Sequence, residues 1–178
     1  EFITREHKAV SPSLADQDII ALARDDGDAV VQILFIRNGK LIGSDSRTLD
    51  GAEDENDSEV IGEFIKRFYS ESAEVPSEIV LPQNIEEARI IEHWLRDRRS
   101  GKRVTITVPQ RGDKRHLVDI AKENANETLH MLRAQWQADT LKQETALGEL
   151  QKALSLPMIP NRIECYDIST TQGTAIVA

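Results

Sequence analysis

Cysteine, aromatic residues and long apolar runs are all scarce in this sequence of 178 residues. The single cysteine, Cys165, excludes an internal disulfide framework, and no Cys/His spacing indicates a zinc site. Aromatic residues make up 4% of the chain, although a hydrophobic content of 39% is ordinary for a folded domain. No apolar run approaches the roughly 20 residues that span a bilayer, and residues 1–15 contain no apolar signal-peptide core. We therefore expect a cytoplasmic protein.

The chain ends suggest a segment of a longer protein. The sequence begins at Glu1 rather than at methionine, and residues 175–178 form an apolar run that stops inside an expected hairpin. A length of 178 residues is enough for one domain with a sizeable core plus additional segments. We expect the partners of any catalytic residue near this end to lie beyond residue 178.

Charge is unevenly distributed along the chain. The net charge of −9 would by itself argue against a nucleic-acid partner. However, residues 44–63 contain eight acidic residues and one basic residue, whereas residues 96–115 contain eight basic residues and two acidic ones. Each run can be a solvated surface, where charged side chains usually lie. The basic run is also a candidate for contact with DNA phosphates.

Periodicity predicts three antiparallel strands in the first part of the chain. An apolar run at 18–23 supplies the first strand, and the β-branched run at 30–36 supplies the second. Asn38-Gly39 is a strong signal for a type I′ hairpin turn, so residues 40–49 supply the returning strand. The three segments predict a meander.

Helices and short strands alternate after an acidic loop at 50–57. A helix is expected to begin with Ser58 as its N-cap, because apolar residues recur at helical spacing from Val60 to Phe68. The elements that follow are a strand at 78–81, a helix opened by residues 82–84, a strand at 103–108 and a long helix from Asp113 to about Leu154. The order β-β-β-α-β-α-β-α is that of the ribonuclease H-like fold, an α/β mixed sheet covered by helices. This analogy concerns the fold alone.

The long helix expected at 113–154 would extend roughly 60 Å, longer than a small domain is wide. Three arrangements are compatible with that length: a bend near Gly148, two separate helices, or one helix that bridges two domains. Pro157 and Pro160 end the helical pattern.

Asp167 is the strongest candidate for a metal-binding and catalytic residue. It lies in an expected strand at 162–169, among the apolar residues Ile163, Cys165 and Ile168. In a ribonuclease H-like fold, a carboxylate of this kind binds one or two divalent ions that promote phosphodiester cleavage. The alternative is an edge-strand aspartate that faces solvent. Cys165 is expected to be a small core residue, because no activating base is identifiable.

A short internal similarity links Asp167 to the beginning of the chain. When Gly27 and Gly173 are aligned, Asp167 falls on Ala21. This register predicts that residues 16–130 form a copy of the same fold without its metal-binding carboxylate.

Basic side chains surround the expected start of the long helix. Backbone amides at a helix N-terminus and nearby cations suit a phosphate group or the DNA backbone. The alternative is a capped helix start whose cations pair with the acidic loop. The candidate DNA-binding residues are Arg99, Lys102, Arg103, Arg111, Lys114 and Arg115.

Four blocks of sequence resemble one known family. They are residues 10–18 (VSPSLADQD), 35–43 (FIRNGKLIG), 108–125 (with VPQRGDKR and LVDIAKENA) and 162–174 (with RIECYDIS and QGT). Together and in this order they resemble the UvrC family, the C subunits of the bacterial excinuclease ABC. The resemblance covers essentially the whole chain.

The resemblance implies a function in nucleotide excision repair. In this process damaged double-stranded DNA is incised on both sides of a lesion, together with the B subunit of the excinuclease, which binds through a region outside this chain. The family also implies a C-terminal ribonuclease H-like endonuclease domain that makes the 5′ incision with Mg²⁺ or Mn²⁺. Asp167 matches its first metal-binding aspartate. The other ligands would lie beyond residue 178, so this chain alone is expected to be inactive and to bind no metal.

The expected organisation has four parts. They are a linker at 1–15, a non-catalytic ribonuclease H-like domain at 16–130, a helical connector at 131–160, and the truncated start of the catalytic endonuclease domain at 161–178. The main expected role of this chain is structural, the positioning of DNA. The alternative is a non-enzymatic protein–protein interaction scaffold that contacts other repair subunits.

Overall fold

The computed structural model describes residues 15–49, 56–165, 169–171 and 175–177. The chain forms two compact units that divide after Leu132. The first unit contains a five-stranded sheet with its helices, and the second contains the end of the longest helix and a two-stranded hairpin. The strands are β1 (Gln17–Asp25), β2 (Asp28–Arg37), β3 (Lys40–Leu49), β4 (Glu78–Val80), β5 (Thr105–Thr107), β6 (Ser169–Thr171) and β7 (Ala175–Val177). The helices are α1 (Asp57–Glu71), α2 (Ala88–Arg98) and α3 (Asp113–Ala153).

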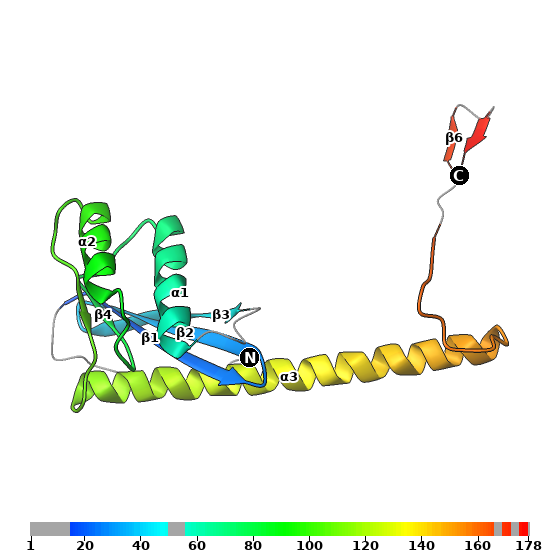
Figure 1. The fold of residues 1–178 in the computed structure, drawn as a ribbon, viewed down its shortest axis with the longest axis horizontal. Helices are drawn as coiled ribbons and strands as arrows, with labels where there is room; N and C mark the ends of the chain where they lie inside the picture. Colours follow the sequence, from blue (N-terminus) through cyan, green and yellow to red (C-terminus); the bar gives the residue numbers. More distant parts are fainter. Residues whose placement is uncertain (1–14, 50–55, 166–168, 172–174, 178) are drawn as a thin grey trace. The chain divides into compact units, whose positions relative to one another are not determined.

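The five-stranded sheet has the order β3-β2-β1-β4-β5. β1, β2 and β3 are antiparallel neighbours, whereas β4 runs parallel to β1, and β5 parallel to β4. Asp26-Gly27 and Asn38-Gly39 turn the chain between the antiparallel strands, and all four residues have positive φ, as type I′ turns require. Element order and mixed pairing confirm the predicted ribonuclease H-like fold (Figure 1).

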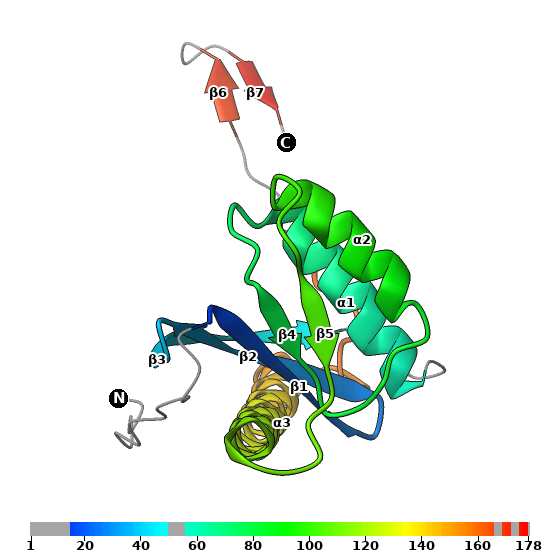
Figure 2. The same ribbon diagram turned by 90° about the vertical axis from the view of Figure 1, so that its left-hand side faces the viewer.

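Helices cover both faces of the sheet in the first unit. α1 and α2 lie on one face, and the first part of α3 lies on the other, as Figures 1 and 2 show. Successive residues of β1 point to opposite faces. Ile20 packs into the core beneath α1 and α2, whereas Ile19 and Ala21 pack against α3. The predicted helical spacing is confirmed, because the apolar residues that it placed on inner helix faces are buried or partly buried.

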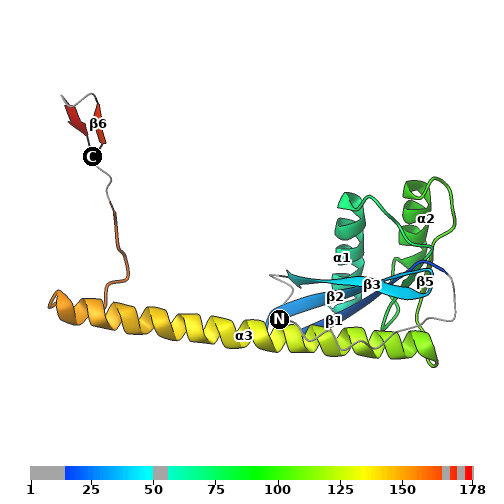
Figure 3. The same cartoon turned by 180° about the vertical axis from the view of Figure 1, so that it is seen from behind.

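β3 forms one edge of the sheet, at the opposite end of the strand order from β4 and β5. Figure 3 views the sheet from the side on which β3 lies nearest. It is exposed along most of its length, and its middle is polar. Asp45 and Arg47 form an ion pair along this strand. An edge that carries charged side chains resists pairing with the strands of other molecules.

α1 is capped by Asn56, and not by Ser58 as expected from the sequence. The Asn56 side chain accepts a hydrogen bond from the Glu59 amide at 3.0 Å, and the Glu59 carboxylate accepts one from the Asn56 amide at 3.1 Å. This reciprocal pair is a capping box, which satisfies two amides that a helix start otherwise leaves unpaired. Ser58 lies inside the first turn, and its hydroxyl oxygen is buried with no partner among the described residues.

Two further element boundaries in the first unit differ from expectation. α2 begins at Ala88 rather than at 82–84, because a separate turn precedes it, in which the Ala88 amide donates to the carbonyl of Ile85. β5 has three residues instead of the expected six at 103–108, because β4, the strand with which it pairs among the described residues, also has three.

The strand expected at 162–169 is wrong over its first part. Residues 162–165 are not in a strand, and Cys165 is exposed rather than buried in a core. No strand in the described part of the chain pairs with residues 162–165, and residues 166–168 lie outside that part. β6 and β7 pair over Ser169–Thr171 and Ala175–Val177, so a hairpin is present at this end of the chain.

α3 is one continuous helix of 41 residues, which excludes the alternative of two helices. Its buried residues all lie between Leu117 and Leu129, so packing on the sheet supports only its first half. No helix in the described part of the chain is long and apolar enough to cross a membrane.

Candidate nucleic-acid-binding edge

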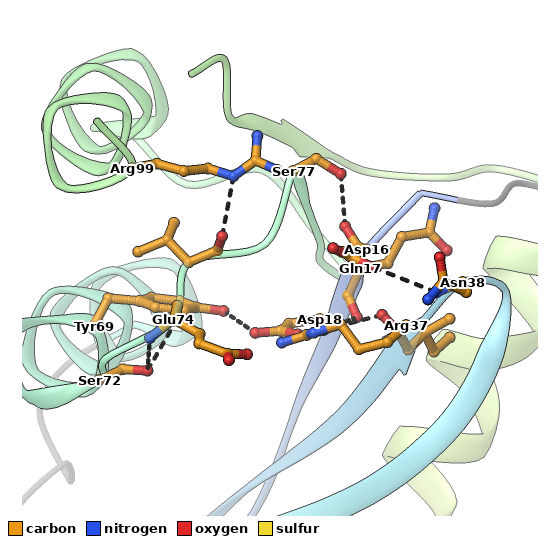
Figure 4. Close-up of polar contacts among 12 residues, drawn as sticks. Asp16, Gln17, Asp18, Arg37, Asn38, Tyr69, Ser72, Glu74, Ser77 and Arg99 are labelled. Carbon is orange, nitrogen blue, oxygen red and sulfur yellow. Dashed lines mark hydrogen bonds and ion pairs between the residues drawn. The ribbon is translucent and has the colours of Figure 1, made fainter. Parts of the chain in front are cut away.

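Three polar side chains are almost completely buried where the parallel strands begin. Gln17 and Asp18 open β1, and Glu78 opens β4, where it pairs in register with Gln17. Because neighbouring side chains on a strand point to opposite faces, Gln17 and Asp18 belong to two separate polar networks. Figure 4 shows the network of Asp18 and the contacts around it.

Asp18 connects β1 to β2 and α1. One carboxylate oxygen accepts a hydrogen bond from Arg37 Nη1 at 2.6 Å, and the other accepts one from the Tyr69 hydroxyl at 2.6 Å. Burial raises the pKa of the Asp18 carboxyl, and the hydrogen bonds from Tyr69 and Arg37 offset part of this effect. Burial, together with the Asp18 carboxylate, raises the pKa of the Tyr69 phenol well above its usual range. The Tyr69 hydroxyl therefore stays protonated and ties α1 to the start of β1.

Glu78 connects β1, β4, β5 and α3. Its carboxylate accepts hydrogen bonds from Gln17 Nε2 at 2.5 Å, Thr107 Oγ1 at 2.7 Å and Lys114 Nζ at 2.6 and 2.8 Å. Burial raises the pKa of this carboxyl, but the three donors and the Lys114 charge outweigh burial and leave the pKa lowered. This network anchors the first turn of α3 to the sheet.

Two basic segments, one on each side of β5, both contact residues 75–78. The segment after α2 contacts them through Arg99, whose Nε donates to the carbonyl of Val75 at 3.1 Å. The segment that opens α3 contacts them through Lys114, which pairs with Glu78 at 2.6 Å. Two of the residues predicted to bind DNA, Arg99 and Lys114, therefore contact one short stretch of chain, residues 75–78.

Three of the six predicted DNA-binding residues are engaged inside the fold. Arg99 donates to two backbone carbonyls, those of Val75 and Arg103. Lys114 belongs to the Glu78 network, and Arg115 pairs with Asp119 one turn further along α3. Arg99 and Lys114 thus hold the two basic segments in place.

The other three predicted residues are Lys102, Arg103 and Arg111, and all are exposed. Within the described ranges, their side chains form no ion pair. They can contact a phosphate without breaking an ion pair to any described residue. The alternative pairing of the basic segment with the acidic loop falls mainly on residues 50–55, which lie outside the described ranges.

Ala21 occupies the middle of β1 and is completely buried. It packs with Leu117, Val118 and Ala121 of α3 in one apolar cluster. A carboxylate at this position would need a metal ion or a cation to compensate for burial. Among the described residues, no group of three or more His, Cys, Asp or Glu side chains is arranged to hold a metal ion.

Asp167 itself lies outside the described residues.

The two buried networks were not identified from the sequence. Asp18 and Tyr69 are 51 residues apart, and Gln17 and Glu78 are 61 apart, so no local spacing links them. The available signal was a polar residue at the start of an apolar strand, as at Asp18 and Glu78. Such a residue needs a partner if the strand is buried.

Topology and packing define the first unit as a ribonuclease H-like domain. The model of the UvrC ribonuclease H-like domain matches residues 16–132, and that of the UvrC RNase H endonuclease domain matches residues 151–178. The chain belongs to the UvrC ribonuclease H-like domain family.

Curated relatives agree with this assignment. UvrABC system protein C of Alkaliphilus oremlandii is 41% identical over 98% of this chain and 28% of its own length. The protein of the same name from Symbiobacterium thermophilum is 39% identical over 100% of this chain and 28% of its own length. The chain thus spans little more than a quarter of these relatives. The alignment with the catalytic domain of human endonuclease V covers 46% of this chain and 38% of the endonuclease V chain, at 11% sequence identity. Its TM-score of 0.29 supports no conclusion.

Proposed function

We propose that this chain is part of an excinuclease C subunit that acts in nucleotide excision repair, and that its ribonuclease H-like domain positions DNA without cutting it. The observation that carries this proposal is the set of exposed cations Lys102, Arg103 and Arg111, which lie on the two segments that Arg99 and Lys114 fix against residues 75–78. Cations that form no ion pair with a described acidic side chain suit backbone phosphates. The proposed substrate is damaged double-stranded DNA, incised on both sides of a lesion. The B subunit of the excinuclease is the proposed partner, bound outside this chain, and the proposed location is the cytoplasm.

The cleavage chemistry is assigned to the endonuclease domain that this chain begins. Asp167 is its proposed first metal-binding and catalytic residue. Mg²⁺ or Mn²⁺ would polarise the attacking water and the scissile phosphate there. In the first unit, the apolar packing of Ala21 against α3 supports a non-catalytic role for residues 16–130.

Fluorescence anisotropy with a labelled DNA duplex tests the positioning role. The chain is expected to bind at about 50 mM salt and to lose affinity steeply as salt rises, because each neutralised phosphate releases counterions. The triple variant Lys102→Gln, Arg103→Gln and Arg111→Gln should bind about tenfold or more weakly and reduce the salt slope by about 2–3, close to one per lost phosphate contact.

A charge-matched triple variant controls for the loss of positive charge. Arg89→Gln, Lys122→Gln and Lys152→Gln remove three exposed cations elsewhere on the chain. We expect this variant to bind nearly as well as the unmodified chain. Equal weakening by both triple variants would show that DNA binding depends on the net charge of the chain and not on these three positions. No binding by the unmodified chain would favour the alternative, a protein–protein interaction scaffold.

A further inference from the structure

The chain that follows α3 has an apolar and exposed surface. Residues 154–161 contain no charged side chain. Leu154, Met158, Ile159 and Ile163 are 61%, 70%, 52% and 66% exposed. Single exposed apolar residues are common on protein surfaces, but a contiguous group of them indicates a contact surface.

The start of this segment has a defined conformation. The amide of Ser155 donates to the carbonyl of Lys152 at 3.2 Å, and the amide of Leu156 donates to the carbonyl of Gln151 at 2.9 Å. Ser155 has a positive φ of 50°, so the helix ends in a Schellman motif. Two prolines restrict the backbone that follows. A segment that is already ordered loses little conformational entropy when it docks.

We propose that residues 154–163 are a strap that packs on an apolar surface of the complete endonuclease domain. The match to the endonuclease-domain family begins at residue 151, so the whole apolar segment lies inside the matched range. The surface that covers the strap therefore belongs to the rest of the same domain and not to a separate protein. Residues 154–160, which the sequence pattern placed in a connector, are thereby assigned to the endonuclease domain.

The strap inference rests on the proposed presence of a complete endonuclease domain in a longer chain, and it is independent of DNA binding. Burying four large aliphatic side chains would stabilise the domain by several kcal/mol, at about 1.5–3 kcal/mol for each fully buried side chain. In this 178-residue chain the same four side chains are exposed, so they contribute no free energy of burial.

Hydrogen exchange compares the strap in the two settings. In a longer chain with the complete endonuclease domain, the amides of residues 158, 159 and 161–163 should exchange at least about tenfold more slowly than in this 178-residue chain. Amides of α1, which belong to the first unit, serve as the control and should exchange at the same rate in both chains. Equal exchange of the strap amides in both chains would overturn the inference.

Substitutions in the longer chain provide a second test. Met158→Asp and Ile163→Asp should each lower the Tm of the endonuclease domain by several degrees, because a charge would enter an apolar contact. Asn161→Asp, an exposed position between them, adds the same charge without removing an apolar group and should leave Tm unchanged. Equal Tm values for all three variants would contradict the strap. A negative result in the DNA titration would leave this outcome unaffected, so the two proposals can fail separately.

Discussion

Gln17 and Asp18 are adjacent in sequence but stabilise opposite faces of the sheet. Asp18 holds α1 through Tyr69, whereas Gln17 contributes to the Glu78 network that anchors α3. The first two residues of β1 therefore help to fix helices on both faces. This arrangement also explains why Lys114 is a structural cation, although it lies among residues predicted to bind DNA.

At the residue scale, Glu78→Gln should destabilise the chain in a pH-dependent way. The folded-state pKa of Glu78 lies below its ordinary value of 4.5, so its contribution to stability is fully present above that pH and is lost as the pH falls through the folded-state pKa. Partial exposure of Lys114 weakens the pair, so we expect a loss of about 1–2 kcal/mol at pH 7. Urea denaturation from pH 7 to pH 3 measures this difference.

The exposed residue Glu74 provides the control for this substitution. Glu74→Gln should change the free energy of unfolding by less than about 0.5 kcal/mol at every pH. Asp18 has a raised pKa, but it is present in all three proteins, so its own pH dependence cancels in the differences. A Glu78→Gln effect of the same size at pH 3 and pH 7 would show that the carboxylate charge is unimportant.

At the scale of elements, the start of α1 depends on Asn56. Asn56→Ala should lower the free energy of unfolding by about 1 kcal/mol, because it removes the side chain of the capping box. Ser58→Ala should be neutral or slightly stabilising, because the Ser58 hydroxyl is buried with no partner among the described residues. Thermal unfolding followed by circular dichroism distinguishes the two residues. A larger loss of stability in Ser58→Ala than in Asn56→Ala would show that Ser58 is the N-cap instead.

α3 has two halves with different surroundings. The first half buries Leu117 to Leu129 against the sheet, and in the second half no described residue is buried. Packing on the sheet cannot hold the second half, so helix propensity and side-chain pairs such as Asp139–Lys142 support it. The Schellman motif then ends the helix where the proposed strap begins.

At the scale of the whole molecule, the element order and the mixed sheet were predictable from the sequence. Hairpin signals such as Asn38-Gly39 and the 3.6-residue period of the helices are local patterns, and both are present in the fold. The exposed cations Lys102, Arg103 and Arg111 were also identified by composition. The attachment of both basic segments to residues 75–78 became visible only in the fold, because Arg99 and Lys114 reach that stretch from different elements.

Other features depend on contacts between distant residues. The short length of β5 follows from the length of its neighbour β4, which its own sequence does not encode. The Asp18 and Glu78 networks join residues from several elements, so no spacing in the sequence indicated them. The exposure of Cys165 was missed for a related reason: an apolar neighbourhood in sequence predicts burial only when another element is present to cover it.

The most direct test of the whole account separates positioning from chemistry in the full-length excinuclease C subunit, assayed together with the B subunit. Single-turnover incision of a damaged duplex is measured over a range of DNA concentrations with Mg²⁺ or Mn²⁺. The triple variant Lys102→Gln, Arg103→Gln and Arg111→Gln should need more DNA for half-maximal rate but reach the same maximal rate. Asp167→Ala should bind DNA normally and lose the 5′ incision while the 3′ incision remains. A lower maximal rate in the triple variant, or 5′ incision that survives in Asp167→Ala, would contradict the account.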